Sequence, residues 1–344
     1  MNTARDGPCE PTVHRAAKPE ATIYSAMSPG GIIVLAGGSG EFQTMANVQA
    51  QYPANQRALA VVQDYVALTK PGIQTLLLVS MLGAMLVASD GVPSFGLVLA
   101  LLIGGSLTSG GANALNCFID RDIDAQMSRT RNRATAAGRI SPAAAMTFGL
   151  TISVLGTLLI GFASNWLAAG LAVAGNLYYV LVYTLWLKRT TPHNIVVGGA
   201  AGAVPPLVGW AAVTGSLAAP AWILFAIIFY WTPPHFWSLA LLKQGDYGRA
   251  NVPMLPVVAG EEATRKQIFL YTVLLSAVSL LLVPFGMGMI YLVGIVALNA
   301  VFLWYAWLLL TDPSKARARQ TFFYSLWYLA LLYVVLVIDR IVFS

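Results

Sequence analysis

The sequence predicts an all-α polytopic membrane protein with nine transmembrane helices. Of its 344 residues, 57% are hydrophobic and only 10% are charged, whereas a soluble domain carries roughly a quarter charged residues. Nine apolar runs are long enough to cross the hydrocarbon core of a bilayer, which takes roughly 20 residues at a rise of about 1.5 Å per residue. These runs lack the alternation of barrel strands, so helices are the expected way to satisfy the backbone hydrogen bonds in lipid.

We expect the spans, in chain order, near residues 73–90, 95–115, 143–163, 167–187, 194–213, 220–242, 267–286, 288–310 and 321–342. Short loops around Asp90, Asn165, Gly215 and Gly286 each join an odd-numbered span to the next one. Longer loops over 116–142 and 243–266 follow the second and the sixth span, and the spans before them descend toward the same side of the membrane.

The basic residues gather in alternate loops. Those loops hold most of the 20 lysines and arginines, namely Arg121, Arg129, Arg131, Arg133, Arg139, Lys188, Arg189, Lys243, Arg249, Arg265, Lys266, Lys315, Arg317 and Arg319. The intervening short loops hold none, and this asymmetry is typical of a cytoplasmic side for the basic loops. We therefore expect the N-terminus inside and the C-terminus outside. A bacterial plasma membrane is the expected location, and a mitochondrial inner membrane is the less favoured alternative. Topology then explains the net charge of +6 without a nucleic-acid partner.

Residues 1–64 are expected to form a poorly structured cytoplasmic extension, and residues 65–344 the transmembrane domain. The extension mixes proline, alanine, glycine and both signs of charge without a sustained period. A mitochondrial presequence is poor in acids, whereas this segment contains Asp6, Glu10, Glu20 and Glu41. No role is assigned to Cys9 or His14 in this segment.

The first inside loop carries a candidate metal and diphosphate site. Asn116, Asp120 and Asp124 are spaced i, i+4, i+8, which stacks them on one face of a helix. Two carboxylates on one face repel each other, so this spacing favours a cation between them, and Mg²⁺ prefers such oxygen ligands together with substrate phosphates. Arg129 and Arg133 follow within a few residues and supply the guanidinium groups that match phosphate oxygens. The alternative is a solvated loop in which the acids pair with nearby arginines, a role we expect for Asp122, which points away from this face.

The second inside loop repeats this acid-plus-base composition with Lys243 and Asp246, and Lys243 is a further candidate for diphosphate binding. His235 lies about two turns before the inside end of the sixth span, and ionisable groups at that depth usually face a cavity or a partner. Pro233 and Pro234 are expected to break the helix just before it. We weigh two roles for His235, a contact with substrate and a packed, hydrogen-bonded core residue.

These motifs resemble the intramembrane UbiA-type prenyltransferases, and the finer match is to the haem-modifying branch of that family. The resemblance runs from about residue 64 to residue 260. The matching segments are Leu68–Pro71, Asn116–Asp124 with Arg129–Arg133, Tyr183–Asn194, Gly198–Pro206, Trp231–Trp237, Asp246–Tyr247 and Val252–Pro256. The Asn-x3-Asp-x3-Asp spacing points to the superfamily, whereas the Trp-Thr-Pro-Pro-His segment and the Lys-Arg-Thr-x-Pro loop point to the haem branch.

The resemblance implies nine helices around a central cavity that opens to lipid, with both acidic loops at its cytoplasmic mouth. It implies farnesyl diphosphate and haem b as substrates, haem O as product, and a hand-over of haem O to a haem A synthase or a terminal oxidase. Asn116, Asp120, Asp124 and Asp246 would bind Mg²⁺–diphosphate. The implied cationic supports are Lys70, Arg129, Arg133, Lys188 and Arg189. With haem as substrate, His235 is predicted to contact it at the active site, as an iron ligand or a propionate partner.

Two other functions stay open at this point. A prenyltransferase acting on an aromatic quinone precursor would share the Asn-x3-Asp-x3-Asp spacing. A membrane transporter or haem carrier would share the hydropathy, but transporters commonly show repeated halves with sites near the middle of the membrane. Here the acids lie at the inside boundary, which favours the transferase.

Overall fold

The computed structural model describes residues 25–28, 31–34, 43–44, 54–89 and 91–343. The chain divides into two compact units, Met1–Leu59 and Ala60–Ser344. The first unit contains an antiparallel sheet in the order β1-β2-β3, formed by β1 (Ser25–Ser28), β2 (Gly31–Val34) and β3 (Gln43–Thr44). The all-α class predicted from the sequence does not include these strands, because segments of four residues or fewer are too short to show the alternating hydrophobic pattern of a strand. Cys9 and His14 lie outside the described residues.

The second unit is helical, and nine of its described segments are long and apolar enough to cross a membrane, as predicted. Helix α2 (Ala54–Leu68) precedes them and begins before the predicted domain boundary. The spans are α3 (Pro71–Ala88), α4 (Phe95–Ile119), α6 (Pro142–Ala163), the continuous segment α7–η1–α8 (Trp166–Leu177, Tyr178–Leu187, Lys188–Thr190), α9 (Asn194–Thr214), α10 (Ala219–Leu242), α13 with η2 (Gly260–Leu280, Val283–Phe285), α14 (Met289–Thr311) and α15 (Lys315–Phe343).

Helices α13 and α15 begin six or more residues earlier than predicted, because their first turns are charged and an apolar window misses them. In α13, Lys266 Nζ lies 2.6 Å from Glu262 Oε1 one turn away. Pairs at this spacing support an exposed helical turn that hydropathy alone does not reveal.

The prolines in the sixth span do not end the helix, which corrects the sequence-based expectation. Helix α10 runs without interruption through Pro233 and Pro234. The hydroxyls of Thr232 and Ser238 donate to the carbonyls of Ile228 and Pro234, both at i−4, at 2.8 and 2.7 Å. The carbonyls that lose a backbone donor at the two prolines are those of Phe229 and Tyr230, four residues earlier, so these hydroxyls do not replace the missing bonds. Packing against neighbouring helices allows a transmembrane helix to retain proline.

Helices α4 and α6 cross at glycines. A Cβ atom at Gly111 would lie 2.0 Å from Ser153 Oγ and 2.5 Å from the carbonyl oxygen of Gly149, and one at Gly156 would lie 2.5 Å from the carbonyl oxygen of Gly104. The two backbones therefore approach closely only because these positions lack side chains, as is common in membrane helix pairs. This contact fixes α4, whose last turn carries Asn116, the first residue of the acidic motif.

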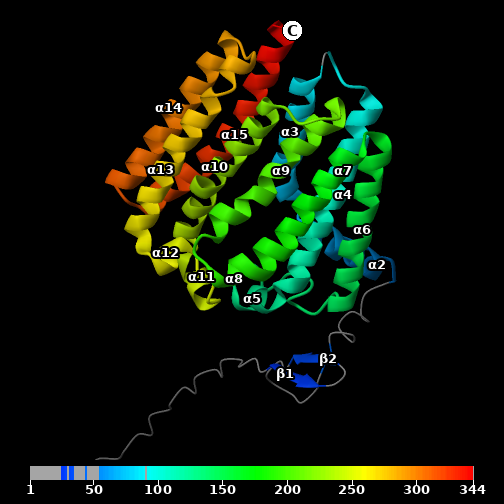
Figure 1. Cartoon of the computed structure of the whole chain (residues 1–344). Coiled ribbons are helices and arrows are strands. Elements are labelled where there is room, and N and C mark those ends of the chain that lie inside the picture. Colours follow the sequence, from blue (N-terminus) through cyan, green and yellow to red (C-terminus); the bar gives the residue numbers. More distant parts are fainter. Residues whose placement is uncertain (1–24, 29–30, 35–42, 45–53, 90, 344) are drawn as a thin grey trace, which may run out of the picture. The chain divides into compact units, whose positions relative to one another are not determined.

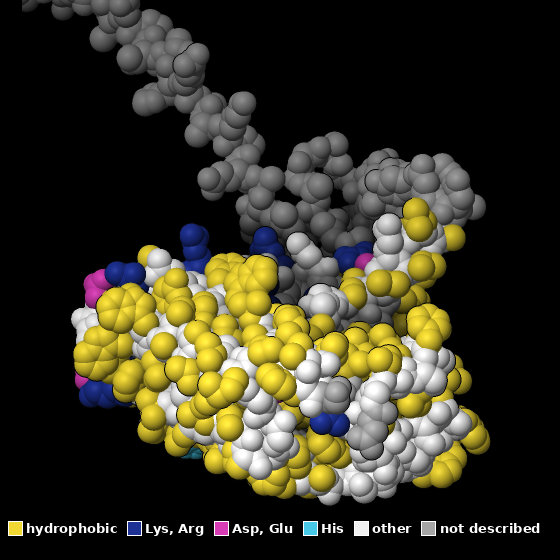
Figure 2. All heavy atoms as spheres, turned by 90° about the horizontal axis from the view of Figure 1, so that it is seen from above, with side chains coloured by type: hydrophobic (Ala, Val, Ile, Leu, Met, Phe, Trp, Pro, Cys, Tyr) yellow, Lys and Arg dark blue, Asp and Glu magenta, His cyan; other side chains and the backbone are white. Residues whose placement is uncertain are grey.

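The largest hydrophobic cluster lies between α3, α9, α10, α13, α14 and α15. The short helices α5 (Arg121–Gln126), α11 (Gln244–Arg249) and α12 (Leu255–Val258) lie at one end of the bundle with α8, and the C-terminus of α15 lies at the opposite end (Figure 1). Seen from that opposite end, the visible surface is mostly hydrophobic or uncharged (Figure 2). The two basic loops that carry the acids are thus brought to the same end.

Candidate active site

The first acidic motif lies on one helical face across the junction of α4 and α5. The N–H of Asp120 donates to the carbonyl of Asn116 at 2.9 Å, and the N–H of Asp124 donates to that of Asp120 at 2.8 Å. The backbone thus keeps its i→i−4 bonds although one helix ends and the next begins here. As a result the three side chains share a face, and all are buried: Asn116 is 3% exposed, Asp120 0% and Asp124 2%.

The π-helix η1 brings cations to this face. Its wider turn is seen where Thr184 Oγ1 donates to the carbonyl of Tyr179, five residues earlier, at 2.8 Å. Two residues that follow η1 directly, Lys188 and Arg189, reach the acids of α4 and α5. Single π-turns often occur at functional sites in helices. The sequence gives no sign of this segment, because its apolar pattern is equally compatible with an α-helix.

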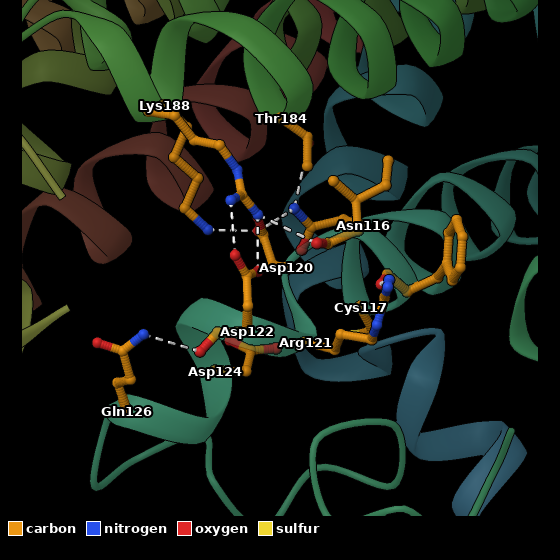
Figure 3. A network of polar contacts seen from close by, with 12 residues as sticks. Asn116, Cys117, Asp120, Arg121, Asp122, Asp124, Gln126, Thr184 and Lys188 are labelled. Carbon is orange, nitrogen blue, oxygen red and sulfur yellow. Dashed lines mark hydrogen bonds and ion pairs between the residues drawn. The ribbon is translucent and has the colours of Figure 1, made fainter. Parts of the chain in front are cut away.

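Asp120 is the centre of the polar network (Figure 3). Its Oδ2 pairs with the ammonium group of Lys188 and accepts from Asn116 Nδ2 at 2.7 Å, and its Oδ1 lies 3.5 Å from Arg189 Nη2. Thr184 Oγ1 accepts the second hydrogen bond of Asn116 Nδ2 at 3.1 Å. Thr184 is a buried site residue that sequence reasoning missed, although it lies within the Tyr183–Asn194 segment that carries the family resemblance.

Lys70 contacts the side-chain amide of Asn116 through its oxygen. It precedes the first residue of α3 in a left-handed conformation, with φ of 53°, which non-glycine residues seldom adopt. Its Nζ donates to Asn116 Oδ1 at 2.6 Å. Burial lowers the pKa of Lys70 to about 8, since a desolvated ammonium group is disfavoured.

Asp124 and Asp122 each have an arginine partner. Both carboxylate oxygens of Asp124 accept from Arg133 Nη1, at 2.8 and 2.7 Å. Burial disfavours the charge of Arg133 most strongly, but the charge of Asp124, the hydrogen bonds to it and the nearby Cys117 and Tyr179 together raise the pKa of the guanidinium. Asp122 has a half-exposed side chain and accepts two hydrogen bonds from Arg189 at 2.7 and 2.8 Å, which lower the pKa of its carboxyl group to about 2. Asp122 thus points away from the shared face.

The second acidic loop contacts the first through Asp246. Its carboxylate accepts from Ser128 Oγ, just beyond α5, at 2.9 and 3.2 Å, and also pairs with Arg249. Burial raises the pKa of the neighbouring Tyr247, while the charge of Arg129 acts in the opposite direction. Arg129 therefore lies near the meeting point of the loops. Lys243 is exposed, and no side-chain contact joins it to the acids among the described residues.

His235 is not brought to the acidic face. Its Nδ1 lies 2.8 Å from Ser325 Oγ of α15, and its ring stacks between Trp231 and Phe322 with centroid distances of 4.4 and 4.8 Å. The side chain is buried, with the whole residue 8% exposed. These contacts are those of a packed, hydrogen-bonded core residue, the second of the two roles considered for it. A role in substrate binding stays a prediction.

The acidic face offers donors suited to Mg²⁺. Two carboxylates and one amide oxygen share a helix face, and hard oxygen ligands of this kind are those that Mg²⁺ takes beside substrate phosphates. Within the described part of the chain, no three acid, histidine or cysteine side chains cluster as a complete metal cage. The donor chemistry fits a metal shared with a diphosphate, provided that Arg133 and Lys188 release the oxygens they now hold.

Comparison with known proteins confirms the family resemblance. The sequence matches the UbiA prenyltransferase family over residues 76–329. The protoheme IX farnesyltransferase of Gloeobacter violaceus is 53% identical over 287 residues, covering 83% of this chain and 94% of that protein. The protein of the same name from Chloroflexus aurantiacus is 52% identical over 283 residues, covering 82% of this chain but only 48% of that protein. The chain spans nearly all of the first relative and about half of the second.

Solved structures show the same fold. The structure of a digeranylgeranylglyceryl phosphate synthase has a TM-score of 0.68 at 20% identity, covering 81% of this chain and 98% of that one. A UbiA homologue from Archaeoglobus fulgidus bound to DMAPP and Mg²⁺ has a TM-score of 0.61 at 15% identity, covering 79% of this chain and 99% of that one. Identities this low establish the fold alone.

Proposed function

This chain belongs to the UbiA prenyltransferase family, and on that premise we propose that it transfers the farnesyl group of farnesyl diphosphate to a vinyl group of haem b. The product is haem O, which carries a hydroxyethylfarnesyl side chain. The choice of haem as acceptor is supported by relatives about 50% identical that are named protoheme IX farnesyltransferase. The observation that carries the site is the convergence of lysines and arginines on the buried Asn116–Asp120–Asp124 face.

The charges at this face support an exchange of partners on substrate binding. Lys188 and Arg133 neutralise Asp120 and Asp124. We propose that a diphosphate takes over these two cations while Asn116, Asp120, Asp124 and Asp246 hold Mg²⁺. The bound metal would neutralise the negative charge that grows on the leaving group. Because buried charges left without partners are costly, metal and diphosphate should bind together rather than separately.

The chemistry then needs only positioning and charge stabilisation from the chain. The allylic C–O bond of farnesyl diphosphate breaks and its electron pair leaves with the diphosphate, whose charge Lys70, Lys188 and Arg133 stabilise. The vinyl group of haem supplies the electron pair for the new C–C bond to the farnesyl carbon. Water then adds to the resulting cation and loses a proton, giving the hydroxyl group. Exclusion of water before the C–C bond forms prevents hydrolysis of the farnesyl cation.

We also propose that the acidic loops face the cytoplasm of a bacterial cell and that haem O passes to a haem A synthase or a terminal oxidase. The alternate basic loops support this orientation. The Arg131→Cys variant should react with a membrane-impermeant thiol reagent in inside-out vesicles and stay unreacted in right-side-out vesicles. The reverse pattern would contradict the orientation. Copurification of the full chain with such a partner tests the hand-over.

The deciding experiment for the reaction uses the full chain in lipid vesicles with haem b, farnesyl diphosphate and Mg²⁺, followed by mass analysis of extracted haem. Haem O and released diphosphate are the expected products. A parallel reaction supplies 4-hydroxybenzoate instead of haem. Prenylated hydroxybenzoate with unchanged haem would refute haem as the acceptor but would still support prenyltransferase activity. Turnover of neither acceptor would refute the proposed reaction.

A further inference from the structure

A groove outside the acidic site lies on the surface formed by α14 and α15. It has a volume of about 560 Å³ and is lined by Tyr305, Arg319, Gln320, Phe323, Tyr324 and Trp327. The α15 members follow one another at the spacing of helical turns, so the groove runs along that helix. The two helices pack against each other, and α14 lies at the edge of the bundle (Figure 1).

The walls of the groove are fixed by contacts of their own. Tyr324 donates its hydroxyl to the carbonyl of Leu298 at 2.9 Å, and its ring contacts that of Tyr305 with centroids 5.2 Å apart. By contrast, Phe323 and Trp327 are 53% and 65% exposed. The groove thus has an ordered floor and an aromatic rim open to the surroundings.

Arg319 marks one end of the groove. Arg319 is exposed and makes no ion pair among the described residues, whereas the neighbouring Arg317 lies 3.4 Å from Asp312. Trp327 lies eight residues further along α15, which corresponds to about 12 Å at the helical rise. The groove therefore pairs one unneutralised positive charge with an aromatic channel that runs from it toward the middle of the bilayer.

We propose that this groove binds one anionic phospholipid, with the headgroup phosphate at Arg319 and the upper acyl chain along Phe323 and Trp327. The charge complementarity selects an anionic headgroup, and anionic lipids are enriched at the face where basic loops gather. The aromatic rings suit the boundary between headgroup and chains. This binding is independent of the proposed transferase reaction, because no groove residue belongs to the acidic site.

The test measures lipid retained by the purified full chain after exchange into vesicles of phosphatidylglycerol and phosphatidylcholine. Wild-type protein should prefer phosphatidylglycerol, and Arg319→Gln should lower that preference about fivefold, as expected for one interfacial cation. Arg319→Lys should restore most of it. Phosphatidylglycerol with brominated acyl chains should quench the fluorescence of Trp327. The fraction of the tryptophan fluorescence that this lipid quenches should therefore be smaller in Trp327→Leu than in the wild-type protein.

The matched control is Lys266→Gln, which removes the same charge in the predicted inside region of α13, where Lys266 pairs with Glu262. An equal loss of the preference for phosphatidylglycerol in both variants would show a general effect of surface charge and would overturn the proposed binding in the groove. Displacement of phosphatidylglycerol by inorganic phosphate alone would assign the site to a free anion and also overturn the proposal. Unchanged melting temperatures show that Arg319→Gln is folded, and an unchanged preference in that folded variant refutes the site.

Discussion

Replacing Thr184 by valine isolates the contribution of a hydroxyl that positions the acidic face. The Thr184 hydroxyl accepts from Asn116 Nδ2 at 3.1 Å and is itself fully buried. Valine has nearly the same shape but cannot accept a hydrogen bond. One N–H of the buried Asn116 amide then loses its partner, while the other still donates to Asp120.

The size of the effect follows from the buried position. An unsatisfied buried donor costs about 1–3 kcal/mol, so the free energy of unfolding should fall by that amount if Asn116 keeps its place. If the amide turns instead, it also loses the 2.6 Å bond from Lys70. The donors for Mg²⁺–diphosphate are then displaced, and kcat/KM for farnesyl diphosphate should fall about 5- to 150-fold for the same energy.

The assay compares thermal unfolding and Mg²⁺-dependent turnover of Thr184→Val with those of two variants. Thr184→Ser keeps the hydroxyl and should recover most of the kcat/KM. Thr232→Val is the matched control, because the Thr232 hydroxyl is buried but donates only to Ile228 of its own helix. Should Thr184→Val match Thr232→Val in both melting and kcat/KM, the hydroxyl would have no positioning role.

Three further changes test the fold and the charges. Gly111→Ala should destabilise the protein by about 1–3 kcal/mol, because its Cβ would lie 2.0 Å from a serine hydroxyl. Gly170→Ala is the control and should not destabilise it, since a Cβ there meets nothing within 4 Å. Thermal melting of both variants tests this difference. Asp339→Ala should cost about 0.5–2 kcal/mol or more, because the carboxylate accepts two N–H groups at the start of α14, and near-wild-type melting would contradict the cap. The Asp122 pKa of about 2 lies below its ordinary 3.8, so its pair with Arg189 stabilises the fold above pH 4 and is lost as the pH falls toward 2. Because this pair is partly exposed, Asp122→Asn should cost under about 1 kcal/mol at pH 7 and less still at pH 3, and a larger loss at pH 3 than at pH 7 would refute this sign.

Local sequence rules predicted the spans and the acidic face well. Hydropathy counts residues independently of their partners, so it found the nine spans but missed polar ends such as the charged first turn of α13 and the last turn of α4. The shared face of Asn116, Asp120 and Asp124 follows from helical periodicity, and it persists because the backbone bonds continue through Asp120. The family resemblance was likewise carried by contiguous motifs.

Local sequence rules could not predict contacts between distant segments of the chain. The position of Thr184 depends on a π-helix, which a wider backbone turn creates without a distinctive sequence pattern. Pro233 and Pro234 predict a break, yet α10 continues through both residues where it packs against the surrounding helices. His235 has a side chain that could bind a substrate, yet both faces of its ring are covered by Trp231 and Phe322.

The sequence by itself determined that this protein is a bundle of membrane helices with both acidic motifs and most of its basic residues on one side, because apolar length and charge are properties of single segments. Only the tertiary structure decided which charges meet. Helix packing brings together Lys70 and Asn116, which are 46 positions apart in the sequence, and Asp120 and Lys188, which are 68 positions apart. That packing buries the carboxylates away from water, where each must find a cation. The same geometry leaves Arg319 outside this network, at the end of the aromatic groove on α15.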